Sequence, residues 1–418
     1  MNKKVLIGII AAVVLLAVAA AFALPAILGG NSGTPQEQLF QAFMKTAQAD
    51  DMQAEGKLKL SWNPINEEMN IQKIKPFVEK SELTFKISAF DLRTKEGQKQ
   101  IDYRLAFRYG GGEVLDLLFR ADTKRVSASS STPYKIGFVR SFEEMLGFKM
   151  DFGKYVDLIL EEDEHVKKVM NSKELRQYAM EAYEGAVATP NDEMPDGEKG
   201  TLIEIELNQE QMLKAQKVLV DYYFEKEDLY KLIETKVKNV VQLLLDSEDY
   251  RFFSDSDEPI RDLLAQIESG EFKEKVDDSF RQLRDDIEDG NAFNIDDQIE
   301  SAGLPAEFAD LMKQKITLKY WIKDGRVAFM KTTFKTPLGP LSMQVKYDYE
   351  PKQVKIKDSD ATVDLDNLDI MGIVQGFVAG LNENQYATEL FQDLSDATGS
   401  EITPDSLLML LMMGMRSF

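Results

Sequence analysis

The sequence predicts an α+β fold with an N-terminal transmembrane helix and antiparallel, curved β meanders covered by a helical middle region and C-terminal helices. Three patterns lead to this prediction: an uncharged run at residues 5–28, two stretches that alternate apolar and polar residues, and a stretch of helical periodicity between them. We divide the chain into a transmembrane anchor (1–28), a linker (29–34), a helix and β meander with helices (35–207), an acidic helical region (208–312), and a second β meander with C-terminal apolar helices (313–418).

The apolar run would form a helix about 36 Å long, enough to cross a hydrocarbon core of about 30 Å. Lys3 and Lys4 precede it and the next basic residue is Lys45, so the positive-inside rule places the rest of the chain outside the cytoplasm. The alternative is a secretory signal cleaved after Ala23, which would make Leu24 the first residue. We favour an uncleaved anchor because signal peptides have shorter apolar regions, and we expect a single-pass protein of the cell membrane with its bulk extracytoplasmic.

The composition excludes several classes of protein. The chain has no cysteine, so it has no disulfide, thiolate metal site, cysteine nucleophile or lipoprotein acylation site. Acidic residues outnumber basic ones by 72 to 50, and residues 246–300 alone carry 19 acidic and 6 basic residues. This acidic span is either a solvated helical surface or a surface that docks on a basic face, and the net charge argues against nucleic acid as a partner.

The first meander follows a helix expected at residues 35–49, where Leu39, Phe43 and Ala47 form one stripe. Apolar and polar residues then alternate in a series of strands, which predicts a sheet with one apolar and one basic-polar face. Gly110 to Gly112 form a hairpin turn and lack the Gly-Lys-Ser/Thr sequence of a phosphate loop. The expected strands cover residues 52–62, 83–89, 101–109, 115–119, 125–128 and 134–139.

Helical periodicity dominates the middle of the chain. We expect helices at 142–186, a polar loop at 189–200, one strand at 201–207, and helices from residue 209 to about residue 312. The second meander begins at Ile316, turns at Asp324-Gly325, which is a strong two-residue hairpin signal, and has a third arm at 341–349. The sequence leaves open whether the two meanders form one sheet.

This order of elements, from an anchor through a helix and a β meander to a helical middle and a second meander, resembles a group of bacterial envelope proteins. These are the lipoprotein-carrier and lipid-transfer proteins, in which helices cover a curved half-barrel sheet. The resemblance spans residues 35–349 and depends on element order and alternation. It implies an anchored envelope protein, and it assigns no functional residue.

The two C-terminal apolar segments contain the candidate site residues. In the first, Gly372, Gly376 and Gly380 lie on one line of a helix beside Phe377, which predicts close packing against a neighbouring group. The second segment, residues 407–415, is apolar all round and should therefore be buried. These helices either pack together beneath the sheet, line a pocket for an acyl chain, or form a dimer or peptide contact; the adaptable methionines of the pocket would be Met409, Met412 and Met413.

Catalytic signals are weak. The single histidine, His165, lies among charged residues, and one histidine cannot form a three-histidine zinc site. The acidic groups at 255–258 and 358–360 lack the glycine and glutamate of a calcium-binding hand. We therefore expect a non-enzymatic protein without a cofactor that binds a lipid or other apolar envelope ligand. The alternatives are a structural or interaction protein of the envelope and, third, a hydrolase that uses paired carboxylates.

Overall fold

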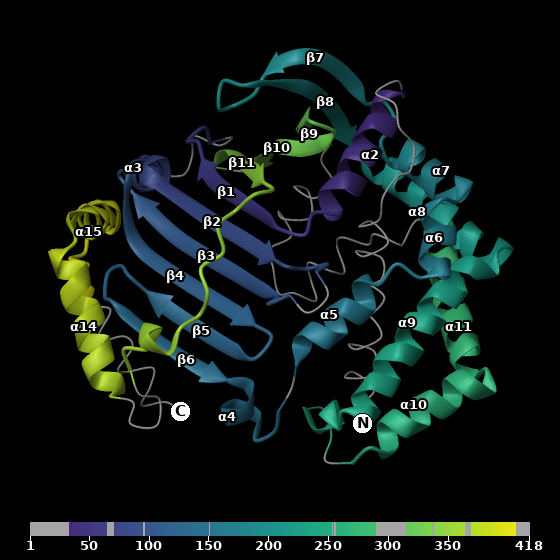
Figure 1. The fold of residues 1–418 in the computed structure, drawn as a ribbon. Coiled ribbons are helices and arrows are strands. Elements are labelled where there is room, and N and C mark those ends of the chain that lie inside the picture. The colour runs from purple at the N-terminus through teal and green to yellow at the C-terminus, as the bar shows by residue number, and fades with distance from the viewer. Residues whose placement is uncertain are drawn as a thin grey trace. The chain divides into compact units, whose positions relative to one another are not determined.

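The computed structural model describes residues 33–64, 71–94, 97–149, 151–252, 254, 256–289, 315–336, 338–363 and 369–406. The expected anchor and the apolar segment at 407–415 lie outside these residues. Within them, no helix is both long enough and apolar enough to cross a membrane. The fold is α+β, with an open, curved, antiparallel sheet and helices (Figure 1).

The strands and helices follow the order that the sequence predicts, with a few additions. The strands are β1 (Met52–Leu60), β2 (Ser81–Phe90), β3 (Gln100–Tyr109), β4 (Gly112–Asp122), β5 (Arg125–Ser130), β6 (Ile136–Ser141), β7 (Val187–Glu193), β8 (Lys199–Leu207), β9 (Ile316–Lys323), β10 (Arg326–Thr336) and β11 (Gly339–Asp348). The α-helices are α2 (Pro35–Ala47), α3 (Lys75–Lys80), α4 (Phe142–Leu146), α5 (Phe152–Leu160), α6 (Glu164–Met170), α7 (Lys173–Ala182), α8 (Gln209–Glu225), α9 (Glu227–Asp246), α10 (Glu258–Ser269), α11 (Glu271–Glu288), α14 (Ile370–Glu383) and α15 (Gln385–Thr398).

The two meanders belong to one sheet of eleven strands among the described residues, in the order β6-β5-β4-β3-β2-β1-β11-β10-β9-β8-β7. They join where β1 pairs antiparallel with β11, from Gln53 opposite Asp348 to Leu60 opposite Leu341. The hairpin predicted at Asp324-Gly325 links β9 to β10, and both residues have the positive φ that a tight two-residue turn needs.

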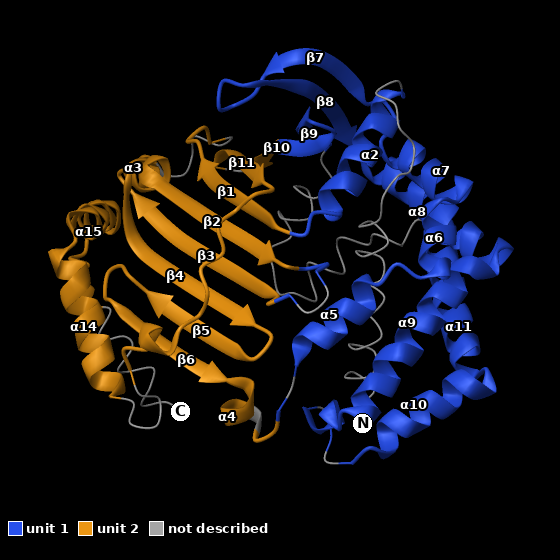
Figure 2. Cartoon of the chain, viewed as in Figure 1, with its two compact units in different colours: residues 1–50, 92–97, 149–330 blue, residues 51–91, 98–148, 331–418 orange. Residues whose placement is uncertain are grey.

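The chain divides into two compact units (Figure 2). Unit 1 contains residues 1–50, 92–97 and 149–330, and unit 2 contains residues 51–91, 98–148 and 331–418. The units therefore interleave along the sequence.

In unit 2, an extended segment that we call the strap, residues 350–363, crosses β2 to β5 and ends beside the edge strand β6 (Figure 1). At that edge the Gly137 carbonyl accepts a hydrogen bond from Thr362 N at 2.7 Å, and Gly137 N donates to Thr362 Oγ1 at 2.8 Å. A Cβ on Gly137 would lie 2.6 Å from the Asp360 carbonyl oxygen. Glycine at this position therefore permits the close approach of the strap.

The C-terminal helices of unit 2 pack at the hairpin end of β3 and β4. Tyr109, fully buried at the end of β3, donates a hydrogen bond to Asp393 of α15. Lys80 pairs with the same carboxylate at 2.6 Å and with Glu389 at 2.7 Å. Because these contacts join α3, β3 and α15, they fix α15 against the sheet.

The helical core of unit 1 centres on α9, which contacts α5, α6, α8 and α10. Buried apolar residues of α8, α9 and α10 include Val220, Leu232, Ile233, Val237, Val240, Leu244, Leu263 and Ile267. Lys236 is also fully buried in α9. It donates to the carbonyls of Leu158 and Glu161 at 3.1 and 2.7 Å and pairs with Asp163 at 3.0 Å, so its ammonium is satisfied at the C-terminal end of α5.

The expectation of a polar loop at residues 189–200 is wrong, because β7 begins at Val187 and pairs antiparallel with β8. The register shifts between Thr189 and Asp192, where Asn191 has a positive φ and Pro190 lacks an N–H group. Pro190 and Asn191, which are typical of loops, therefore form a bulge within a strand. Most β7 side chains are exposed, so the alternation of buried residues that identifies a strand is missing.

Candidate functional site

Two rows of side chains cross β3, β4, β5 and β6 on one face of unit 2. The antiparallel register places residues directly opposite one another across neighbouring strands, and opposite residues share a face. The first row is Ile101, Ala121, Val126 and Arg140, and the second is Tyr103, Phe119, Ala128 and Phe138. Seven of these eight residues are apolar, so the pattern seen in the sequence becomes a continuous apolar surface.

This surface is hollowed into an open groove of about 740 Å³, which is within the range of about 300–1,000 Å³ typical of small-molecule sites. The hollow reflects the difference in side-chain size along the two rows. The small residues are Ala121, Val126 and Ala128, and the large ones in the second row are Tyr103, Phe119 and Phe138. Met145 of α4, Arg140 and Glu144 also line the groove. Arg120 and Ser127 border it as well, although they pair with each other at strand positions that alternate with the apolar rows. The groove is therefore an apolar hollow with a few charged residues.

The lining remains accessible to solvent. Ile101 is 51% exposed, Phe119 48% and Met145 56%, and Leu83 and Ile87 extend the exposed apolar surface onto β2. Single exposed apolar residues are common on proteins, but a contiguous patch beside a hollow is typical of a ligand or partner site.

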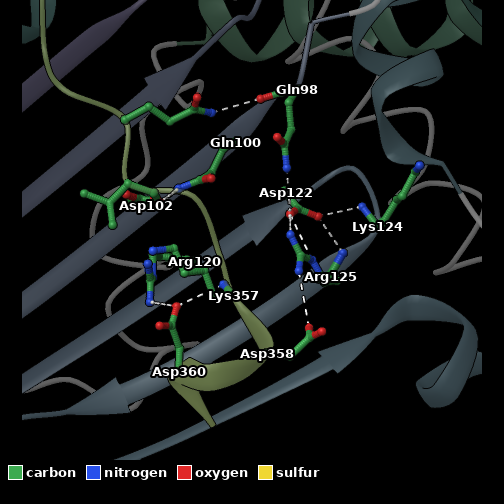
Figure 3. A network of polar contacts seen from close by, with 12 residues as sticks. Gln98, Gln100, Asp102, Arg120, Asp122, Lys124, Arg125, Lys357, Asp358 and Asp360 are labelled. Carbon is green, nitrogen blue, oxygen red and sulfur yellow. Dashed lines mark hydrogen bonds and ion pairs between the residues drawn. The ribbon is translucent and has the colours of Figure 1, made fainter.

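The opposite face of the same strands is polar and is covered by the strap (Figure 3). Arg120 is buried and pairs with Asp360 at 3.0 Å, and Gln100 donates to the Val354 carbonyl at 2.8 Å. Burial raises the pKa of Asp102, against an opposing hydrogen bond from Gln100. These contacts hold β3 to β5 from the polar side, which leaves the apolar side available to form the groove.

The structure places the glycines of α14 against the loop between β5 and β6. A Cβ on Gly376 would lie 2.5 Å from the Tyr134 ring, and one on Gly380 would lie under 3.0 Å from the Pro133 carbonyl oxygen. Gly372 faces only the Asp369 side chain that caps its own helix. The neighbour of the glycine line is therefore a loop of the same unit, and none of these glycines lines the groove.

Of the other predicted site residues, Phe377 packs beside the cluster of Tyr109, Leu381, Leu390 and Phe391. Met409, Met412 and Met413 lie outside the described residues.

Helix α15 was not predicted, although Ala387, Leu390, Phe391 and Leu394 have helical spacing and Asn384 caps the helix. For the strands β3 to β6, the sequence predicted an apolar face but no groove. The cross-strand register that makes their residues a site is not visible in one sequence.

The described aspartates of the candidate metal groups have arginine partners in the structure. Asp358 and Asp360 pair with Arg125 and Arg120, at 3.4 and 3.0 Å, and so anchor the strap. Asp257 pairs with Arg261 at 2.6 Å, and Asp255 is outside the described residues. His165 is half-buried in α6. Within the described ranges, no three histidine, aspartate or glutamate side chains are grouped to hold a metal ion.

Two further hollows are more polar. One, of about 640 Å³, lies beside the end of α15 in unit 2, and the other, of about 470 Å³, lies beside β7 and β8 in unit 1. The second contains Glu204 and Glu206, which pair with Lys319 and Lys315 at 2.6 and 3.5 Å. We therefore take the apolar groove of unit 2 as the candidate site.

Comparison with protein-family models, curated proteins and solved structures found no match for this chain.

Proposed function

We propose that this protein binds an elongated apolar ligand, such as an acyl chain of a lipid, in the groove formed by β3 to β6. The single observation that carries this proposal is the exposed, contiguous apolar lining. In water this lining is unfavourable by about 25 cal/mol for each Å² of apolar surface, and a chain-like ligand would relieve that cost. The predicted anchor would hold the protein at the outer surface of a membrane, where such ligands are abundant.

The test uses photo-crosslinking of the full-length protein held in an amphipathic polymer, which avoids free detergent micelles. The probe is hexadecanol bearing a diazirine, a neutral molecule that reports on apolar binding alone. We expect covalent adducts on peptides from β3 to β6. Phe119→Lys should reduce labelling there about tenfold, since a buried apolar contact of this size contributes about 1.5–3 kcal/mol.

The matched control is Val187→Lys, which makes the same kind of change at an apolar residue of unit 1 that is 63% exposed. Both variants change exposed side chains, so both should melt like the unmodified protein. Equal labelling of the unmodified protein and Phe119→Lys would refute the proposal, as would adducts spread evenly over the described residues.

A further inference from the structure

The polar face of unit 2 carries a group of lysines on β1 and β10, on either side of β11. Lys57 and Lys59 of β1 lie directly opposite Gln344 and Ser342 of β11. Residues that are opposite in an antiparallel pair share a face, so these four belong to the polar face. The strap crosses β2 to β5 and does not cover this part of the face, and both lysines are exposed.

Strand β10, the neighbour of β11, adds two more lysines to this face. Side chains alternate between the two faces along a strand. In β10, Lys331, Thr333 and Lys335 are exposed, whereas Thr332 and Phe334 are not. Phe334 therefore belongs to the apolar face, and the lysines belong to the polar one. We call these residues the basic patch: Lys57, Lys59, Lys331 and Lys335.

The basic patch is unusual on this acidic chain, because its lysines form no ion pair or side-chain hydrogen bond with any described residue. Elsewhere, the exposed lysines Lys168, Lys214 and Lys231 each pair at 3.0 Å with a glutamate one helical turn away. The acidic residue of β1 is Glu55, which lies opposite Lys346 of β11. The patch therefore presents four positive charges that have no carboxylate partner within the described ranges.

We propose that the basic patch binds an anionic membrane surface through the phosphate groups of acidic lipids. Lysine is a compact point charge on a flexible stem, which suits a diffuse layer of phosphates, whereas a single phosphate in a dedicated site is typically held by arginine or by backbone N–H groups in a concave loop. None of the three hollows described above is lined by these lysines, which lie on an open face of the sheet. The predicted anchor would keep them near such a surface.

The test measures how close the basic patch comes to lipid headgroups in the full-length protein. Because the chain has no cysteine, Thr333→Cys gives a single site for a neutral fluorophore between Lys331 and Lys335. The protein is placed in nanodiscs of phosphatidylcholine, with or without phosphatidylglycerol, and both contain the same fraction of a spin-labelled headgroup that quenches fluorescence. Fluorescence lifetimes then give the ratio of quenched to unquenched label.

We expect this ratio to be about 25-fold higher or more on the anionic discs, since each lysine near an anionic surface contributes about fivefold. The difference should disappear in about 1 M salt, where the Debye length is only about 3 Å. The double variant Lys57→Gln, Lys59→Gln removes half of the patch charge, and it should lower the ratio on anionic discs about 25-fold.

The matched control is Lys135→Gln, Lys217→Gln. It removes two exposed lysines from other elements, the loop between β5 and β6 and helix α8, and it should leave the ratio unchanged. Both double variants change only exposed side chains, so both should melt like the unmodified protein.

An equal ratio on neutral and anionic discs would overturn the inference, as would an anionic ratio that the Lys57→Gln, Lys59→Gln protein retains. A patch that binds polyglutamate but does not respond to anionic lipid would overturn it in favour of an acidic protein partner. The proposed function is tested separately, because the neutral diazirine probe should label β3 to β6 equally in all these variants.

Discussion

Replacing Gly380 with alanine should destabilise unit 2, although alanine is the better helix former. Gly380 lies in α14, where an added Cβ would come under 3.0 Å from the Pro133 carbonyl oxygen. Ordinary contacts between non-bonded carbon atoms are about 3.5–4.0 Å, so the helix and the loop between β5 and β6 would have to separate. The neighbour is backbone, so it cannot move aside by a change of rotamer.

The expected magnitude is the difference between two effects. Overpacking costs about 1–3 kcal/mol, and we take the upper end because the clash is with backbone. Alanine recovers about 1 kcal/mol of helix propensity. The net loss should therefore be about 2 kcal/mol for Gly380→Ala. Gly376→Ala should be close to neutral, because the Tyr134 ring that it meets is a movable side chain.

The assay can isolate unit 2, because the chain has two tryptophans, Trp62 in unit 2 and Trp321 in unit 1. In a Trp321→Phe background, the fluorescence of Trp62 follows denaturant unfolding of unit 2 alone. Gly372→Ala is the matched control in the same helix, where only the capping carboxylate of Asp369 must move. A Gly380→Ala protein as stable as this control would refute the close contact between α14 and the loop.

Two further changes test buried charges. Lys236→Met should destabilise unit 1 by about 3 kcal/mol, since it leaves Asp163 and two carbonyls without their donor. Denaturant unfolding followed by the fluorescence of Trp321 measures this loss, and an unchanged unfolding midpoint would contradict the prediction. Burial raises the pKa of Asp393, but hydrogen bonds from Lys80 and Tyr109 outweigh it and hold the pKa below its ordinary value. The ionised form of Asp393 therefore stabilises unit 2 above about pH 4, and this stabilisation is lost as the pH falls through the folded-state pKa. The difference in stability between the unmodified protein and Asp393→Asn should therefore shrink between pH 7 and pH 3. A difference that stays constant over this range would contradict the prediction.

Local patterns predicted most of the fold. Alternation identified β1 to β4 and β9 to β11, because each has an apolar face that must alternate with a polar one. The prediction failed at β7, where bulge residues resemble a loop. The pairing of β1 with β11 could not be predicted. The paired residues lie about 290 positions apart, and a single sequence contains no signal for pairing at that distance.

The candidate site was less predictable than the fold. The sequence identified Ile101, Tyr103 and Phe119 as apolar strand residues but did not predict that they form a site. It placed the candidate site at α14, where Gly376 and Gly380 pack against a loop. Whether an apolar face is covered depends on tertiary packing. The strap covers the polar face through Arg120 and Asp360. The role of Asp358 and Asp360 in anchoring the strap could not be predicted, because their partners Arg125 and Arg120 are distant in sequence.

The hydrogen bonds between the strap and the edge strand β6 have a consequence for solubility. An open sheet has two edge strands, and an edge with unpaired N–H and carbonyl groups can recruit a strand from another copy and start a fibre. At Gly137 these backbone groups already bond to Thr362, and the far edge, β7, is interrupted by Pro190 and a bulge. The protein can therefore leave an apolar face exposed with a lower risk of polymerisation, because both edges that flank the sheet are poor templates for strand addition.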